Sequence, residues 1–297
     1  MSSLSRRRFL TIAAAGAAVP TGALANVTAR WRGVALGAQA SMQLVGLTET
    51  QAAPVFAAVD QELNRLENIF SLYRDTSELS RLNRDGHLTA PSADLLNVLS
   101  MCSAVHDASN GVFDPTIQPV WAALANGVSP DQARRKVGFE AVRFDLSEVR
   151  FVGNVAGHAM TLNGIAQGAI TDRVSVLLRA HGLRDVLIDM GEIAALGRRA
   201  DGTHWQAGIA DPTGQIHQRI QLADRALATS APTGMTLREH AHIMHPAGRG
   251  VTRTLASVSA PTAAVADGLS TALCLVDDTL AQTMVQQFPG ARIELIA

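Results

Sequence analysis

The chain has 297 residues, of which 47% are hydrophobic and 17% are charged, and its formal net charge is −1. This length is enough for one large hydrophobic core or two smaller ones. Aromatic residues make up only 4%, so we expect a mainly aliphatic core, and the lack of a long basic run after the N-terminus gives no support for nucleic-acid binding.

Residues 1–25 differ in composition from the rest of the chain. Arg6 and Arg7 precede an apolar run rich in alanine and glycine, and "ALA" ends the segment at 23–25. This order is typical of a twin-arginine export signal with an A-x-A cleavage site, and the run is too short for a permanent membrane anchor. A disordered basic tail is the alternative. The signal predicts export of a folded protein to the bacterial periplasm, with residues 26–297 as the functional domain.

The first predicted elements after this segment are a strand and two helices. Residues 33–46 are expected to form a strand. Residues 49–70 place their apolar side chains on one face, as an amphipathic helix does. Ser92 is a good N-cap for a second helix that runs to about Ser109.

The middle of the chain is expected to contain a hairpin, a helix and a buried strand. Residues 141–162 alternate in polarity around Gly153, and a helix from about 165 to 180 is closed by Gly182. The buried strand follows at 185–191. The remaining predicted elements are strands near 193, 205, 217, 227 and 255, a helix at about 261–276, a helix at about 278–287 and a strand at 291–297. With no regular βαβ rhythm, this order predicts an α+β fold of mixed, mostly antiparallel sheets with packed helices.

The two cysteines, Cys102 and Cys274, both lie in apolar helical patterns. An oxidising compartment would permit a disulfide between them. The pattern favours two buried free thiols instead. The sequence also has no Cys/His spacing of the kind that binds zinc.

Asp267 and Thr271 are the most informative pair of polar residues. They are four residues apart in a predicted helix, so they share one face. A carboxylate and a hydroxyl are hard oxygen ligands of the kind that Mg²⁺ prefers. The alternative is an aspartate near a helix start and a threonine packed within the helix.

Two acidic residues lie next to a proline or a glycine. Asp114 precedes Pro115, which holds it extended, so it could cap a turn or accept hydrogen bonds from a ligand. Glu192 follows Gly191 at the end of the predicted strand at 185–191, where the glycine permits close backbone approach. A tight turn explains this second pattern as well.

The segment 238–246 contains three histidines, His240, His242 and His245. No acidic or cysteine partner stands at the usual zinc-site spacing. One histidine acting as a general base or phosphate contact is the functional interpretation, and surface histidines are the alternative.

The stretch "TLNGIAQGAITDR" at 161–173 places Gly164 just before a predicted helix. A glycine turn that leads into a helix N-terminus is suited to binding phosphate. The stretch is neither a P-loop nor a dinucleotide-binding fingerprint, and no hydrolase-triad motif occurs elsewhere in the chain.

Taken in order, these segments resemble the ApbE family of FAD:protein FMN transferases over about residues 33–276. The segments that carry the resemblance are "LGAQAS", "SLYRDTSELSRLN", "GVFDPTIQPVW", "LNGIAQGAITD", "LIDMGEI", "WQAGIADP", "LATS", "HIMHP" and "SVSAPTAAVADGLSTAL". Within the family, the chain looks most like the NosX-type members, which are linked to maturation of the nitrous-oxide reductase system.

The resemblance implies a fold, a reaction and an acceptor. The fold is α+β with a T-fold-like core. The reaction is the Mg²⁺-dependent transfer of FMN from FAD to a Thr or Ser hydroxyl of a partner protein, with AMP leaving. The acceptor motif is of the type D/S-G-A/S-T-x-A/S-T, and a membrane-bound NosR-like flavoprotein is the expected partner.

The resemblance also implies site residues. It assigns Mg²⁺ to the backbone carbonyl of Gly164 and the side chains of Asp267 and Thr271, and it makes His242 a catalytic base or a phosphate contact. The implied flavin-contacting positions are Leu36, Tyr73, Val112, Phe113, Asp114, Thr161 and Gln167.

Several positions depart from the family pattern. Thr161 stands where many members have Asp, Gln167 where they have Lys, and His245 where they have a second Asp. Gln167 can donate and accept hydrogen bonds but brings no charge. Two other functions stay open. An FAD pyrophosphatase would use the same site with water in place of the acceptor hydroxyl and give FMN and AMP. The departures at Thr161, Gln167 and His245 keep open a non-catalytic flavin carrier.

Overall fold

The computed structural model describes residues 27–153 and 156–297, so the predicted export signal lies outside the described residues. Within the described residues, no helix is both long enough and apolar enough to cross a membrane. The polypeptide forms helices and antiparallel sheets, which confirms the predicted α+β fold class.

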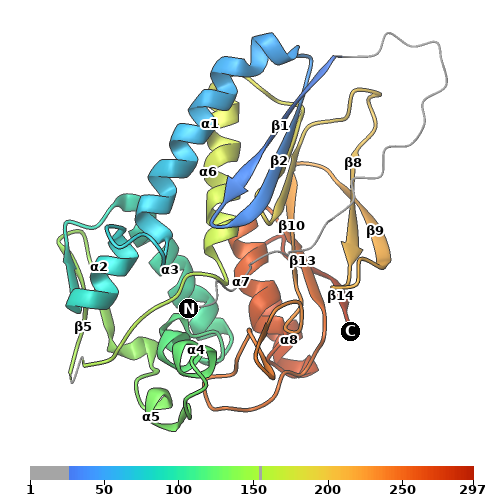
Figure 1. Cartoon of the computed structure of the whole chain (residues 1–297). Coiled ribbons are helices and arrows are strands. Elements are labelled where there is room, and N and C mark those ends of the chain that lie inside the picture. Colours follow the sequence, from blue (N-terminus) through green and yellow to red (C-terminus); the bar gives the residue numbers. More distant parts are fainter. Residues whose placement is uncertain (1–26, 154–155) are drawn as a thin grey trace.

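A seven-stranded sheet in the order β1-β2-β6-β7-β10-β13-β14 is the centre of the fold, and each neighbouring pair is antiparallel (Figure 1). Its strands are β1 (Thr28–Ala35), β2 (Ala38–Val45), β6 (Val186–Asp189), β7 (Ile193–Leu196), β10 (Arg225–Ser230), β13 (Ala256–Ala260) and β14 (Arg292–Ile296).

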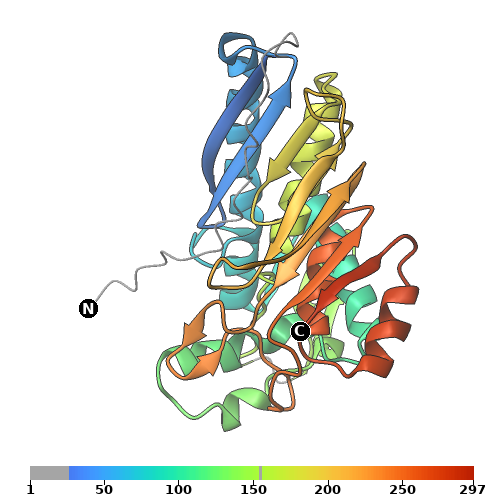
Figure 2. The same cartoon turned by 90° about the vertical axis from the view of Figure 1, so that its right-hand side faces the viewer.

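The two faces of this sheet are covered differently (Figures 1 and 2). Three helices pack on one face: α1 (Glu49–Phe70), α6 (Ala166–Ala180) and α7 (Ala263–Leu273). The hairpin of β8 (Trp205–Ala210) and β9 (Ile216–Leu222) packs on the other face. Side chains alternate between the two cores with the period of two expected of a strand. On β10, Ala226 and Ala228 join the helix side, and Leu227 joins the hairpin side.

Shorter elements surround this framework. They are α2 (Glu78–Asp85), β3 (His87–Thr89), α3 (Ala93–Ala108), a 3₁₀ turn (Pro115–Ile117), α4 (Gln118–Ala125), α5 (Asp131–Arg134), a second 3₁₀ turn (Phe139–Ala141), β4 (Val142–Phe144), β5 (Glu148–Phe151), β11 (Thr236–Leu237), β12 (His240–Ala241) and α8 (Asp278–Gln286). Strands β3, β5 and β4 form a separate small sheet.

The long predicted helices are confirmed, because their sequences carry both an apolar face and end signals. Ser92 accepts a hydrogen bond from the backbone N–H of Leu95 and caps α3, and Gly182 follows α6 with a left-handed φ of 78°. Both cysteines are buried free thiols, as predicted.

The predicted strand at 33–46 is wrong, because the chain reverses within it. Leu36 and Gly37 have φ values of 47° and 82°, and they form the two-residue turn of the β1–β2 hairpin. Turns of this type need positive φ at both positions, and leucine gives no sequence signal for it.

The predicted hairpin at 141–162 is centred on the wrong residues. Strands β4 and β5 turn at Asp145, whose Oδ1 accepts hydrogen bonds from the backbone N–H groups of Ser147 and Glu148. Gly153 follows the hairpin, and residue 154 lies outside the described part of the chain. An aspartate that bonds the backbone two residues on is a turn signal in its own right.

Candidate functional site

Helices α6 and α7 approach each other closely at their N-terminal ends. A Cβ built at Gly168 would overlap the carbonyl oxygen of Ala263, so only glycine permits this crossing. The N-cap residues of the two helices, Ile165 and Thr262, make no side-chain cap hydrogen bond. The free backbone N–H groups of each first turn must therefore find other partners.

Each helix supplies the capping carboxylate of the other. The Gly168 N–H of α6 donates to Oδ2 of Asp267 on α7 at 3.0 Å. The N–H groups of Ala263 and Ala264 on α7 donate to Oδ1 and Oδ2 of Asp172 on α6, at 2.7 and 2.9 Å. These reciprocal caps fix the position of Asp267 relative to α6.

The Asp267 side chain is buried, and its residue is only 3% exposed. Burial raises its pKa to about 7, while the Gly168 hydrogen bond lowers it and nearby Asp172 raises it. No positively charged side chain forms an ion pair with Asp267 among the described residues. A bound cation would therefore offset the cost of ionising it.

Thr271 lies one turn beyond Asp267 and contacts the segment before α6. A Cβ at Gly164 would lie 3.2 Å from Thr271 Oγ1 and 3.3 Å from Phe113 Cε2. Ser230, at the end of β10, hydrogen-bonds to Ser270 at 2.8 Å and lies 3.4 Å from Thr271 Oγ1. The structure thus brings together the three predicted metal-binding positions.

The donor set at these positions fits a hard divalent cation. It combines a carboxylate, a hydroxyl and a backbone carbonyl, and Asp267 Oδ1 has no hydrogen-bond partner among the described residues. Within the part of the chain that the structure describes, no group of three or more His, Cys, Asp and Glu side chains is arranged to hold a metal. A zinc-type site is therefore not supported there.

His242 follows β12 and is largely enclosed. Its Nδ1 lies 2.9 Å from the carbonyl oxygen of Pro232 and 3.0 Å from that of Met235. Because carbonyl oxygens only accept hydrogen bonds, the proton of the neutral ring is assigned to Nδ1, and Nε2 of that neutral ring is unprotonated. Burial lowers the pKa of His242 below its usual 6.5. The ring is thus neutral at pH 7 and able to accept a proton at Nε2.

His242 and Thr271 both contact the chain at the end of β10. Pro232, which accepts hydrogen bonds from both the backbone N–H and the ring of His242, lies two residues beyond Ser230. His240 is exposed. His245 is buried, and its Nδ1 accepts a hydrogen bond from the Ala247 N–H.

The Asp114 carboxylate is used inside the protein. Oδ1 accepts hydrogen bonds from the backbone N–H and the hydroxyl of Thr116, and Oδ2 accepts one from the Phe139 N–H at 3.1 Å. This is the turn-capping arrangement that the sequence allowed. Val112 and Phe113 lead into the turn, and Phe113 is buried against Gly164.

Thr161 and Gln167 flank Gly164 in the chain. The Thr161 N–H donates to the Pro115 carbonyl, and its hydroxyl accepts a hydrogen bond from the Asn163 N–H. The Gln167 amide lies over Gly191, where a Cβ would overlap Nε2. The neutral Gln167 therefore packs on the turn after β6. The same segment carries Asp189 and Glu192, and burial raises the pKa of both carboxyls.

Leu36 is partly buried against the main core, whereas Tyr73 is exposed. Glu67 joins their segments, because its Oε1 accepts a hydrogen bond from the Leu36 N–H at 3.0 Å and its Oε2 forms an ion pair with Arg74. Tyr73 is 55% exposed. The polar link through Glu67 has no signal in the sequence, because its partners are 31 and 7 residues away.

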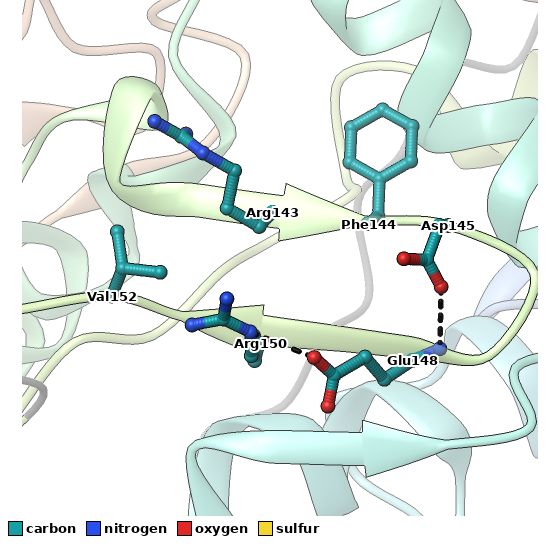
Figure 3. Close-up of a pocket in the computed structure, with 6 residues that line it drawn as sticks. All are labelled: Arg143, Phe144, Asp145, Glu148, Arg150 and Val152. Carbon is teal, nitrogen blue, oxygen red and sulfur yellow. Dashed lines mark hydrogen bonds and ion pairs between the residues drawn. The ribbon is translucent and has the colours of Figure 1, made fainter.

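Two cavities lie away from the metal-binding positions. The larger, about 290 Å³, lies on the β4–β5 hairpin, where Arg143 and Arg150 stand opposite each other and Arg150 pairs with Glu148 (Figure 3). The second, about 190 Å³, lies between β1 and α1 and is bordered by Glu67 and Arg74. Only the second adjoins a predicted flavin-contacting segment.

The fold and the site define an α+β protein with an oxygen-rich, buried site where α7 passes the N-terminal end of α6. Such a site is suited to a divalent cation and a phosphate group. The chain belongs to the ApbE family, whose model matches residues 36–295. The predicted family is therefore confirmed.

Relatives and solved structures agree with this assignment. The chain is 27% identical over 245 residues to a protein of Haemophilus influenzae, covering 73% of this chain and 71% of that one, and 27% identical to one of Treponema pallidum, covering 80% and 76%. Both are named FAD:protein FMN transferase.

Among solved structures, the fold matches flavin transferase ApbE from Vibrio cholerae with a TM-score of 0.76 and 21% identity, covering 90% of this chain and 93% of that one. The apo form of the Pseudomonas stutzeri flavinyl transferase ApbE matches with a TM-score of 0.74 and 22% identity, covering 88% and 89%. At these identities the structures establish the fold.

Proposed function

We propose that the chain is an FAD:protein FMN transferase that moves FMN from FAD to a Thr or Ser hydroxyl of an acceptor protein and releases AMP. Membership of the ApbE family and the names of its relatives support the class of enzyme. The observation that carries the proposal is the juxtaposition of Asp267, Thr271 and Gly164 at the start of α6.

Mg²⁺ is the metal that this site is proposed to bind, through the carbonyl of Gly164 and the side chains of Asp267 and Thr271. When bound there, Mg²⁺ would neutralise the phosphate charge and polarise the phosphorus–oxygen bonds of FAD. The N-terminus of α6, with its positive dipole end, favours a pyrophosphate at the same place.

The proposed reaction is an in-line displacement at the phosphorus on the FMN side of FAD. The acceptor hydroxyl oxygen forms the new bond to phosphorus, the bond to the oxygen that bridges to AMP breaks, and AMP leaves with that oxygen. His242 accepts the hydroxyl proton at Nε2, directly or through water, because Nδ1 already carries a proton donated to Pro232 and Met235. The carbonyls that hold Nδ1 also orient the ring.

The flavin end of FAD is proposed to contact Leu36, Tyr73, Val112, Phe113, Asp114, Thr161 and Gln167. Both carboxylate oxygens of Asp114 already accept hydrogen bonds from Thr116 and Phe139. A flavin contact would therefore use the Asp114 backbone or a remaining lone pair of its carboxylate. The acceptor is proposed to carry a D/S-G-A/S-T-x-A/S-T type motif in the periplasm, on a NosR-like membrane flavoprotein. Export of residues 26–297 by the twin-arginine signal at 1–25 belongs to the same proposal.

The test is intact-mass spectrometry of an acceptor domain after incubation with the protein, FAD and Mg²⁺. A mass gain on the acceptor that equals FMN, lost when EDTA is added, is the expected result. Release of AMP and free FMN without acceptor labelling would instead identify an FAD pyrophosphatase. Bound FAD that stays intact would identify a flavin carrier.

The base is tested by His242→Ala, with His240→Ala as the matched control two residues away. We expect the His242 variant to lose about 10² in transfer rate, in the range typical of a general base. The exposed His240 should be replaceable without effect. Transfer at the wild-type rate by His242→Ala would remove His242 from the proposed role.

A further inference from the structure

Asp172 is a partly buried carboxylate on α6 that the proposed reaction does not use. Both of its oxygens are occupied by the first-turn N–H groups of α7, at 2.7 and 2.9 Å. The proposed reaction assigns it no contact with the metal or with a phosphate. Its role must be sought in what it does to α7.

The residues that Asp172 holds are one helical turn from a proposed metal ligand. Asp267 follows Ala263 by four residues, which is about 6 Å along a helix axis, and Thr271 follows by one turn more. Because a helix is stiff over two turns, fixing its first turn against α6 also fixes where Asp267 and Thr271 lie.

A second contact, from α6 to Asp267 on α7, depends on the same position of α7 along α6. Asp267 Oδ2 receives the Gly168 N–H at 3.0 Å, one turn before Asp172 on α6. The backbones of α6 and α7 are in close contact at Gly168, because a Cβ there would overlap the Ala263 carbonyl. The two helices are thus joined by carboxylates at two points, and the Asp172 point lies outside the proposed metal site.

We infer that Asp172 is a positioning residue that holds α7 in the register at which Asp267 and Thr271 face Gly164. The inference deepens the proposed function and rests on it where the metal is concerned. Losing the Asp172 cap would let the first turn of α7 move away from α6. Asp267 Oδ2 would then lose its fixed distance to Gly168, and Oδ1 would lose its orientation.

The experiment compares Asp172→Ala with Asp277→Ala in the full chain. Asp277 is the N-cap of α8 and accepts a hydrogen bond from the Leu280 N–H at 2.9 Å, so its removal also deletes a carboxylate cap, but away from the proposed site. Mg²⁺ binding is measured by titration calorimetry without FAD, and exchange of the Gly168 amide proton is followed by NMR without metal.

We expect Asp172→Ala to weaken Mg²⁺ binding by about tenfold or more, as is usual when a residue that orients a ligand is removed. The Gly168 amide should exchange about tenfold faster, which corresponds to the loss of a charge-assisted hydrogen bond. Asp172→Asn, which keeps one acceptor oxygen, should show smaller changes in the same direction and replaces Asp172→Ala if that variant does not fold. Asp277→Ala should change neither quantity.

Wild-type Mg²⁺ affinity together with wild-type Gly168 protection in folded Asp172→Ala would overturn the inference and leave Asp172 a stabilising cap only. Equal effects of Asp172→Ala and Asp277→Ala would overturn it as well. If the wild-type protein binds no Mg²⁺, the proposed function loses its metal, and the exchange of Gly168 decides the positioning by itself.

Discussion

The two sides of the proposed site are built in opposite ways. On the metal side, Asp267 is 3% exposed and is held by the backbone of a second helix. On the flavin side, Tyr73 is 55% exposed, and its segment is joined to Leu36 through the polar side chain of Glu67.

The contrast teaches how substitutions should act on each side. Changes on the metal side should alter chemistry and folding together, because the same atoms cap helices and face the proposed metal. A change at the exposed Tyr73 should alter affinity alone, since exposed side chains away from caps and cores contribute little to the free energy of unfolding.

The largest expected effect is on the metal side. Asp267→Ala should lower AMP release from FAD by at least about a hundredfold, because it removes the charged ligand of the proposed Mg²⁺. Asp267→Asn keeps an oxygen that can accept the Gly168 hydrogen bond and removes the buried ionisable group, so it should lose activity without a fall in melting temperature. AMP release and thermal melting measure the two. Full activity in Asp267→Ala would show that Asp267 is not a metal ligand.

Gly168→Ala should come next, as a change in stability. The added Cβ meets backbone at Ala263, which cannot move as a flexible side chain could, and overpacking of this kind costs about 1–3 kcal/mol or more. Gly250→Ala is the control, because nothing lies within 4 Å of a Cβ there. Urea unfolding of both variants gives the comparison, and equal stabilities would contradict the tight crossing of α6 and α7.

A smaller effect is expected in the pH dependence of the metal-free protein. Burial raises the folded-state pKa of Asp267 to about 7, those of Asp189 and Asp172 to about 6, and that of Glu192 well above its usual value. A carboxylate with a raised folded-state pKa binds more protons when folded, so the free energy of unfolding should fall as pH rises from about 5 to 7, by up to about 1.4 kcal/mol per pH unit for each such group.

A substitution separates the contribution of Asp267 from those of the other carboxyls. Asp267→Asn should flatten the curve near pH 7, where Glu192 also contributes, and leave the part nearest pH 6, to which Asp189 and Asp172 contribute. Urea unfolding at half-unit pH steps measures the slope. An unchanged curve in Asp267→Asn would mean that Asp267 does not carry the raised pKa.

The smallest effect belongs to the flavin side. Tyr73→Ala should raise KM for FAD by about two- to tenfold through loss of one aromatic contact, with an unchanged melting temperature and little change in kcat. Tyr73→Phe, which keeps the ring, should stay close to wild type. A large loss of stability in Tyr73→Ala would remove the contrast between the two sides.

Local sequence signals predicted the long helices and the order of most strands. The helix at 49–70 has an apolar face, and Gly182 supplies a left-handed cap, so each could be placed from its own residues. The turn at Leu36 and Gly37 could not be placed, because a leucine with positive φ follows from its surroundings in the fold.

The site could be predicted only in part. Spacing alone placed Asp267 and Thr271 on one face of a helix, and the resemblance to a family joined them to Gly164. The reciprocal caps could not be foreseen, because Asp172 and Asp267 meet partners 91 and 99 residues away. A carboxylate in mid-helix has the same local sequence whether it faces solvent or the end of another helix.

The two buried thiols give the protein an internal reporter of opening. Cys102 lies on α3 and Cys274 directly follows α7, two helices that pack together. Burial raises the pKa of Cys274 to about 12 and that of Cys102 well above its usual range, so at pH 7 only about one in 10⁵ Cys274 side chains would be a reactive thiolate. A thiol reagent added to the native protein should therefore react only when the core around these thiols opens, so labelling reports that opening without any label introduced by mutation.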